Sequence, residues 1–398
     1  MERSQPCPVT IHVGRQAGNL KGEGERGRAG NKQENRSAAS YRFKMSHLDT
    51  TLRYIKGHTV VPLFITGETC AVLREMPDEV VDFCMTSPPY WGQREYASGG
   101  IGEEKTHAEY KANLLAVFAQ VHRVLKPTGS FWLNIGDTYQ GKGLLGLPWR
   151  IALAMIDEQG WVLRNSVIWD KIKGGLDQSG DRLRNVHEDV FHFTKKSKGF
   201  YYDVDAIKAD PRKSKVVNGA VVSATGVSGK RYKRQIELST ALSEAERAAA
   251  IAALADVLAD VREGRLNDFR MVIRGQHRTT HSDSARVSGR AKELQEKGFY
   301  FLKYDPKGTK PTDLWAILPE DALGRAPDGR SAHDAAYPEE LCLIPLLATC
   351  PPDGIALDMF CGTGTTNAVA CRLGRKSIGI DLSEKYTAFA RERVGGTP

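Results

Sequence analysis

The strongest constraint on the fold is the order of hydrophobic patterns, because short apolar segments typical of buried strands alternate with segments typical of helices. Strand-like segments lie at 63–67, 80–86, 130–136, 162–169, 189–195, 355–360 and 376–381. Helix-like segments lie at 68–76, 107–125, 148–159, 364–373 and 383–393, and KPTG (126–129) reads as a turn. Strands that alternate with helices form a mostly parallel sheet covered on both faces. The order therefore predicts an α/β, doubly wound sheet.

A basic segment, residues 208–310, interrupts this rhythm. It holds 21 Lys and Arg against 12 Asp and Glu, whereas the whole chain holds 56 against 48. Its Ala-rich stretch, 243–264, places Ile251, Leu254 and Leu258 at helical spacing, which is typical of a packed helix. We interpret 208–310 as an insert that divides one α/β domain into halves at 60–207 and 311–398.

Residues 1–46 show neither helical nor strand periodicity and are rich in Gly, Arg, Asn, Gln and Ser. This composition predicts a disordered tail. Met45 stands just before the first ordered-looking segment, so we consider it a possible start of the protein.

Composition excludes several classes of protein. The chain of 398 residues is 41% hydrophobic, which is enough for a sizeable core, and it has no run of 18 apolar residues that could span a membrane. Its seven cysteines are scattered without a CxxC pair, and His277 and His281 have no Cys or Glu beside them. We therefore expect no metal site, no disulfide framework and a reducing cytoplasm.

The first motif with chemical content is TSPPYW, residues 86–91, directly after a buried strand. Pro88 and Pro89 stop the strand and fix backbone φ angles, so the loop holds Ser87 and Tyr90 rigidly. The carboxyl ends of strands are where open α/β sheets bind ligands. The loop is therefore a candidate active-site loop rather than an ordinary turn.

The second motif is LDMFCGTGTT, residues 357–366, in which Gly362 and Gly364 separate a strand from a helix. Glycines allow a ligand to approach the backbone, and a helix N-terminus offers N–H donors. The next strand ends at Asp381, an acid that can accept both hydroxyls of a ribose. The glycine pattern of this motif is not the dinucleotide GxGxxG, and no GK[ST] of a phosphate loop follows it. The pattern indicates an adenosine cofactor without a pyrophosphate, namely S-adenosyl-L-methionine.

These motifs in this order resemble the β-class amino-group DNA methyltransferases, the N4-cytosine/N6-adenine-specific DNA methylase family. Supporting matches are RVLKPTGSFWLNIGD (123–137), SVIWDK (166–171) and YPEEL (337–341). Glu68 departs from the pattern, since the family usually has Asp in its GD[SA] segment. The resemblance implies a seven-stranded, circularly permuted methyltransferase sheet with a target-recognition region between the two motifs. It also implies that both loops follow neighbouring strands.

The resemblance assigns roles residue by residue. Ser87 Oγ and the Pro88 carbonyl would accept the two protons of the target amine, with Pro89 shaping the loop. Tyr90 would stack on the flipped base through its ring face rather than its hydroxyl. The predicted cofactor-binding residues are Asp358, Phe360, Gly362, Gly364 and Thr365 at the methionine end, Asp381 at the ribose, and Tyr337 and Pro338 in support of the methionine. Trp169 and Lys171 read as packing and surface residues, and Asp137 as a turn residue.

The expected partner is double-stranded DNA. KRYKR (230–234) would contact phosphates, and the polar stretch 270–286 would read bases. A cognate restriction endonuclease, a prokaryotic cytoplasm and nucleoid, and a monomer or homodimer fit the class. SPPY followed by Trp91 favours N4-cytosine as the target, with N6-adenine and a catalytically silent DNA-binding relative as alternatives.

Overall fold

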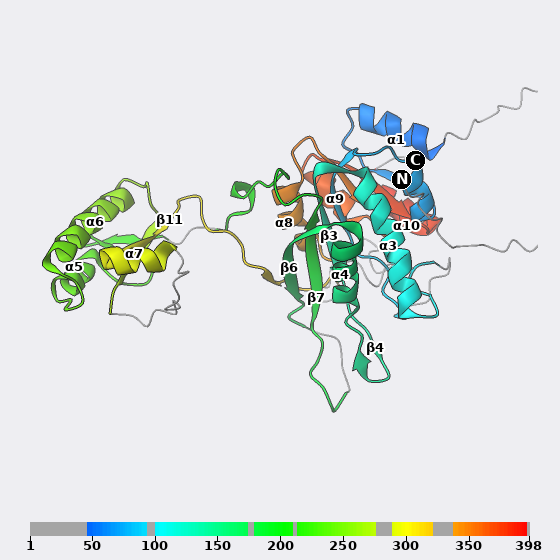
Figure 1. Cartoon of the computed structure of the whole chain (residues 1–398). Helices are drawn as coiled ribbons and strands as arrows, with labels where there is room; N and C mark the ends of the chain where they lie inside the picture. Colours follow the sequence, from blue (N-terminus) through cyan, green and yellow to red (C-terminus); the bar gives the residue numbers. More distant parts are fainter. Residues whose placement is uncertain are drawn as a thin grey trace, which may run out of the picture. The chain divides into compact units, whose positions relative to one another are not determined.

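The computed structural model describes residues 46–93, 100–173, 179–209, 213–275, 289–320 and 337–395. The predicted tail, 1–46, lies outside these ranges except for Ser46, as do His277 and His281. The chain forms two compact units (Figure 1). Unit 1 comprises Met1–Tyr201 and Leu314–Pro398, and unit 2 comprises Tyr202–Asp313.

An eight-stranded sheet in the order β1-β14-β13-β2-β3-β7-β6-β12 forms the centre of unit 1. Its strands are β1 (Leu63–Thr66), β14 (Lys376–Asp381), β13 (Ile355–Asp358), β2 (Val81–Thr86), β3 (Leu125–Ile135), β7 (His187–Thr194), β6 (Val162–Asp170) and β12 (Leu314–Ala316). All neighbouring pairs are parallel except the two that β7 makes, with β3 and with β6. The predicted α/β, doubly wound, mostly parallel sheet is confirmed.

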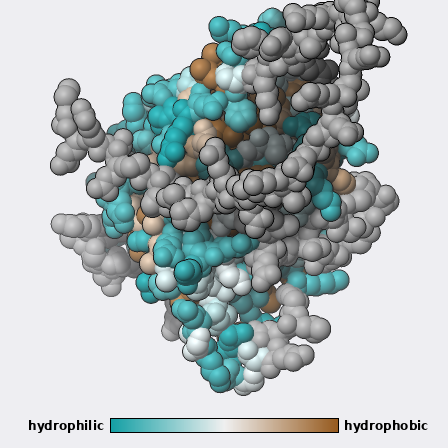
Figure 2. Space-filling model, turned by 90° about the vertical axis from the view of Figure 1, so that its right-hand side faces the viewer, coloured by the Kyte–Doolittle hydropathy of each residue, from teal (hydrophilic) through white to brown (hydrophobic). Residues whose placement is uncertain are grey.

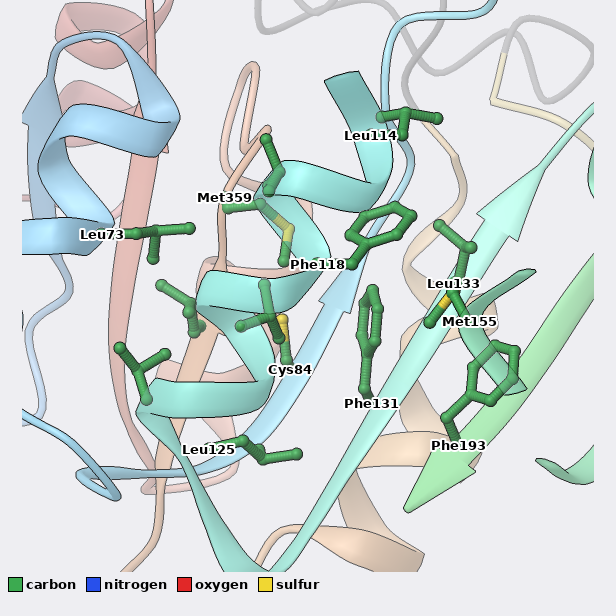
Figure 3. Close-up of a cluster of buried hydrophobic side chains, with 14 of the residues drawn as sticks. Leu73, Cys84, Leu114, Phe118, Leu125, Phe131, Leu133, Met155, Phe193 and Met359 are labelled. Carbon is green, nitrogen blue, oxygen red and sulfur yellow. The ribbon is translucent and has the colours of Figure 1, made fainter. Parts of the chain in front are cut away.

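Side chains of alternating strand residues build one core on each face of the sheet. One core contains Cys84 and Phe131 together with helices α2 (Thr69–Glu75), α3 (His107–Val124) and α4 (Leu147–Gln159). Its centre is drawn in Figure 3, where Phe118 of α3 faces Phe131 of β3 at a ring separation of 5.2 Å. The other core contains Phe83 and Trp132 together with α8 (Glu339–Thr349) and α9 (Thr365–Arg372). Helices on both faces bury the sheet, which explains its nearly continuous apolar strands.

Two further helices complete the sheet's cover. The helix α1 (His47–Lys56) places Tyr54 in the first core, and α10 (Glu384–Arg393) packs Ala390 against Phe64 of β1. A short hairpin, β4 (Tyr139–Gln140) and β5 (Gly143–Leu144), follows β3.

On the face drawn in Figure 2, hydrophilic side chains predominate among the coloured residues. Among the residues that the structure describes, no helix is long and apolar enough to cross a membrane.

The sheet differs from the sequence expectation in two details. The short strand β12, parallel to β6, adds an eighth strand to the expected seven. The expected turn at 126–129 lies within the bounds of β3, where the pairing with β2 jumps from Val81–Leu125 to Phe83–Ser130. The extra residues of this irregularity bulge out of the ladder, so a Pro-Gly segment is accommodated inside a strand.

Unit 2 has its own core. The antiparallel strands β10 (Asp268–Ile273) and β11 (Phe299–Tyr304) lie with α5 (Gly229–Glu237), α6 (Glu244–Arg262), α7 (Gly289–Lys297), the hairpin β8 (Lys215–Val217) and β9 (Ala220–Val222), and the short 3-10 helix η1 (Asp205–Ile207). The helix α6 begins with a capping box between Ser243 and Glu246 and buries Leu254, with Ile251 and Leu258 packed at the edge of the core. It is a packed helix, as its spacing predicts.

Candidate active site

The two sequence motifs lie side by side, because they follow neighbouring parallel strands. Leu357 of β13 pairs with Cys84 of β2, so the loops after Asp358 and after Thr86 leave the sheet at the same edge. A 2.6 Å hydrogen bond from Thr86 Oγ1 to Asp358 Oδ1 joins the two strand ends directly. The prediction that the two loops follow neighbouring strands is confirmed.

Asp358 is the buried centre of this junction, with only 1% of its surface exposed. Its carboxylate accepts hydrogen bonds from Thr86, from the Phe360 amide at 3.2 Å and from the Tyr337 hydroxyl at 3.0 Å. Burial raises the pKa of Asp358 to about 6, although these hydrogen bonds oppose the shift. The structure thus places Asp358 where it holds the two motifs together, while the Tyr337 hydroxyl contacts Asp358 and Thr366 of the second motif. The neighbouring Pro338 is buried and caps α8.

The SPPY loop is held by contacts on both sides. Pro88 is buried, and the Pro89 carbonyl accepts a 2.9 Å hydrogen bond from the Tyr110 hydroxyl of α3. Gly102 packs so closely that a Cβ there would lie 3.2 Å from Pro89. The loop therefore presents Ser87 and Tyr90, both partly exposed, from a fixed backbone.

The Tyr90 hydroxyl points into a polar cluster at the edge of the sheet, which we call the Tyr90 cluster: Ser87, Tyr90, Asn134, Lys171 and Glu188. Ser87 Oγ donates to the Tyr90 hydroxyl oxygen at 3.1 Å, and the Tyr90 hydroxyl lies 2.8 Å from Glu188 Oε2. Asn134 Nδ2 donates to the same carboxylate oxygen at 2.9 Å, and Lys171 Nζ pairs with the other. Strand ends of β3, β6 and β7 bring these residues to the SPPY loop.

Two expectations change with this cluster. The hydroxyl of Tyr90 has partners of its own, which a role for the ring face alone does not explain. Lys171 reads as a surface residue in the sequence but lies in the cluster, whereas Trp169 is buried and donates to the Ile317 carbonyl at 2.8 Å. Glu188 was not singled out from the sequence, because it stands just before the expected strand 189–195 and belongs to no motif.

The glycine-rich loop after β13 requires its glycines. Gly362 and Gly364 have φ angles of 49° and 74°, and a Cβ on Gly364 would lie 3.0 Å from both Phe64 and Ala390. Gly364 is the N-cap of α9, so the N–H groups of the first turn open toward this loop. Thr365 is buried and its hydroxyl accepts a 3.1 Å hydrogen bond from Arg393, while Phe360 remains partly exposed.

Asp381 ends the adjacent strand β14 and lies against the same loop. Its carboxylate accepts hydrogen bonds from the Gly362 amide at 2.9 Å and from the Ser383 amide at 2.8 Å. Burial raises the pKa of Asp381 above its usual value, and the two amides oppose that shift. Each carboxylate oxygen retains acceptor capacity beyond one amide, so a partly exposed Asp381 can also accept hydroxyl groups.

The donor set at this loop fits S-adenosyl-L-methionine. Asp381 offers a carboxylate for ribose hydroxyls, and the N-terminus of α9 offers N–H groups for a carboxylate. No phosphate-binding lysine is needed for such a ligand. Within the described ranges, no group of three His, Cys, Asp or Glu is placed to hold a metal ion.

Two other motif residues have local structural partners. Asp137 accepts hydrogen bonds from the amides of Thr138, Gly146 and Leu147, so it orders the hairpin turn before α4. Glu68, which departs from the family pattern, caps α2 by accepting from the Cys70 and Ala71 amides.

Unit 2 carries a basic helix face. In α5, Tyr232 and Ile236 are buried, whereas Lys230, Arg231 and Arg234 are exposed and line a surface hollow with Gln235 and Leu238. Because α5 is amphipathic, its apolar face packs in the core of unit 2 and its cations face the solvent.

The sheet, the glycine-rich loop and the acid that ends the next strand define an S-adenosyl-L-methionine-dependent α/β methyltransferase. The family model described as DNA methylase (N6_N4_Mtase) matches residues 81–392. The chain belongs to this family of DNA methylases, which confirms the resemblance read from its motifs, and its cofactor is S-adenosyl-L-methionine.

Individual relatives align over most of the chain. The type II methyltransferase M.SfiI of Streptomyces fimbriatus is 29% identical over 378 residues, covering 80% of this chain and 88% of the relative. M.SmaI of Serratia marcescens is 26% identical over 363 residues, covering 83% and 89%. The solved structure titled PvuII DNA methyltransferase (cytosine-N4-specific) shares the fold with a TM-score of 0.50 and 18% identity, covering 84% of this chain and 86% of that one.

Proposed function

We propose that this DNA methylase is a site-specific N4-cytosine methyltransferase acting on double-stranded DNA. The observation that carries the proposal is the placement of a partly exposed SPPY loop beside the glycine-rich loop, at adjacent ends of β2 and β13. Two ligands bound at these loops would meet at one edge of the sheet. SPPY followed by Trp91, as the sequence predicts, favours cytosine over adenine.

The target amine is a poor nucleophile because its lone pair is conjugated into the base. Ser87 Oγ and the Pro88 carbonyl would each accept one of its protons, which turns the lone pair out of conjugation. Since Ser87 donates its own proton to Tyr90, its oxygen lone pairs remain available for that task. The contribution is orientation and electrostatic stabilisation by groups fixed beforehand.

The base must leave the duplex to reach this loop. The ring of Tyr90 would stack on the flipped base, while Gly136 packs against the ring closely enough that a Cβ there would lie 2.7 Å from it. Gly136 therefore supports the stacking platform, and any larger residue would displace it.

On the cofactor side, Asp381 would hold the ribose, and Phe360, Gly362, Gly364 and Thr365 would surround the methionine end. Asp358, Tyr337 and Pro338 would support that end through their buried contacts rather than by direct binding. The bound cofactor supplies an electrophilic methyl group; the chain's own residues orient the amine toward it.

Unit 2, which spans the predicted insert 208–310, would recognise the DNA site. The exposed cations of α5 would contact phosphates, and other residues of the unit would read base edges. The similarity to type II methyltransferases supports a role in a restriction–modification system, in which the enzyme would act beside a cognate endonuclease in a prokaryotic cytoplasm. It would act as a monomer or as a homodimer.

The test is mass spectrometry of nucleosides from DNA treated with the enzyme and methyl-labelled cofactor. Labelled N4-methyldeoxycytidine is the expected product. Labelled N6-methyldeoxyadenosine would make the enzyme adenine-specific, because Ser87 can accept from either amine. An incubation without enzyme gives the background label, and the matched variant Ser87→Ala should incorporate label on the order of 10²–10³-fold more slowly. Unlabelled DNA would indicate a silent DNA-binding relative.

A further inference from the structure

The hydrogen bonds of the Tyr90 cluster run in one direction. Ser87 Oγ donates to Tyr90 at 3.1 Å. A phenol has one proton, and the Tyr90 hydroxyl lies 2.8 Å from Glu188 but 3.5 Å from Asn134, so Glu188 receives that proton's hydrogen bond. The hydroxyl groups of Ser87 and Tyr90 therefore form a continuous hydrogen-bonded path to the Glu188 carboxylate.

Glu188 is built to remain an acceptor. Its side chain is 11% exposed and is paired with Lys171, whose ammonium balances the charge of the carboxylate. Asn134, on β3, donates to Glu188 Oε2 and fixes the oxygen that faces Tyr90. Burial, followed by the Glu188 carboxylate, raises the pKa of Tyr90 well above its usual value. The phenol therefore stays neutral and can receive one proton while it passes on another.

We propose that Ser87, Tyr90 and Glu188 form a proton relay that carries the proton lost by the target amine to Glu188. This inference rests on the proposed function, because it needs an amine hydrogen-bonded to Ser87 Oγ. Glu188 acts through two other residues, so it is a positioning residue and the final proton acceptor.

The step balances without a further reactant. The nitrogen lone pair forms the new N–C bond, and the electrons of the broken S–C bond remain on sulfur. The nitrogen then carries a surplus proton, which passes to Ser87 Oγ as the serine's own proton moves to Tyr90 and the phenol's proton moves to Glu188. The carboxylate becomes a carboxylic acid, both hydroxyl groups end with one proton each, and Glu188 loses its proton to solvent after product release.

The experiment uses the full chain with three variants. Tyr90→Phe keeps the ring face but removes the middle of the relay, and Glu188→Gln keeps an acceptor for Tyr90 but cannot take up the proton. The matched control is Asp82→Asn, which also converts a buried, lysine-paired carboxylate into an amide: Asp82 is 10% exposed and pairs with Lys126 at 2.9 Å. Asp82 lies near the start of β2, away from the strand end that bears Ser87.

Three quantities are measured for each protein: cofactor affinity, the single-turnover rate of methyl transfer, and that rate in mixtures of light and heavy water. We expect Tyr90→Phe and Glu188→Gln to lower the rate about 100-fold, at the lower end of what acid–base assistance contributes. Cofactor affinity should change less than twofold. The wild type should show a curved dependence on deuterium fraction, as several moving protons require, and both variants should lose the curvature.

Asp82→Asn should keep both the wild-type rate and the curvature. A relay variant with the wild-type rate and an unchanged isotope dependence overturns the relay while the methyltransferase function stands. Slowing of Asp82→Asn to the same extent also overturns it, because the effect would then reflect structure alone. A wild-type chain that methylates no DNA removes both the proposed function and the relay.

Discussion

Replacing Asp358 by Asn should change how the stability of unit 1 depends on pH. Asp358 is buried and joins the two motif strands, and its pKa in the folded chain is about 6 against an ordinary value of 3.8. The folded state therefore binds this proton more tightly than the unfolded state does. The stabilisation of the folded state by this proton is fully present below pH 3.8, where both states are protonated, and it is lost as the pH rises through about 6.

The magnitude follows from the size of the shift. Two pKa units correspond to about 3 kcal/mol between the fully protonated and fully ionised limits. About half of this, or ~1.5 kcal/mol, falls between pH 5 and pH 8, because the unfolded chain is already mostly ionised at pH 5. The Asn variant has no such proton, so the stability of the wild type should fall by ~1.5 kcal/mol relative to the variant over this range.

Urea unfolding followed by tryptophan fluorescence measures this difference. All six tryptophans lie in unit 1, so the signal reports the unit that contains Asp358. Tyr337→Phe is a second probe: it removes a donor to the carboxylate, which should raise the pKa of Asp358 further and steepen the pH dependence. Parallel stability curves for wild type and Asp358→Asn would refute the reasoning.

Two further predictions concern binding. Asp381→Ala should weaken S-adenosyl-L-methionine binding by ~1.5–3 kcal/mol, which is the range for a charge-assisted hydrogen bond. Calorimetric titration of the folded variant measures this loss. An unchanged affinity would mean that the ribose binds elsewhere. Replacing residues 210–308 by a short Gly/Ser turn is feasible because Ala209 and Thr309 already pair as neighbours. This variant should bind cofactor but lose site-specific methylation and the steep salt dependence of DNA affinity, whereas retained site specificity would contradict recognition by unit 2.

The sequence predicts the sheet well because its strands are buried on both faces. Continuous apolar segments such as VVDFCMT then mark strands without alternation, and the motif order places two of them side by side. The reversed direction of β7 and the short strand β12 could not be predicted in this way. Strand direction depends on long-range pairing, and three residues such as Leu314–Ala316 give too little pattern.

The candidate site likewise contains some residues that the sequence predicts and others that it does not. Ser87, Tyr90 and Asp381 can be found because each follows an apolar strand within a compact motif. Glu188 lies 98 residues and Lys171 lies 81 residues after Tyr90 in the chain, and each stands at a strand end without a recognisable pattern. The pairing of β3 with β7, which sets Ile135 opposite Asp189, and that of β6 with β7, which sets Trp169 opposite Glu188, bring them to the loop. The partners of Asp358 lie in the quoted motifs, but the hydrogen bonds that Thr86 and Tyr337 donate to it form only once the fold brings these segments together.

The most direct test of the account is single-turnover methyl transfer by Ser87→Ala, measured beside its cofactor affinity. The account assigns Ser87 to the target amine and the glycine-rich loop to the cofactor, so the two measurements should separate. The rate should fall on the order of 10²–10³-fold, as for the loss of one preorganised polar group, while cofactor affinity stays within twofold. Full activity in Ser87→Ala, or a loss of cofactor binding with unimpaired transfer at saturation, would contradict the division of labour between the two loops.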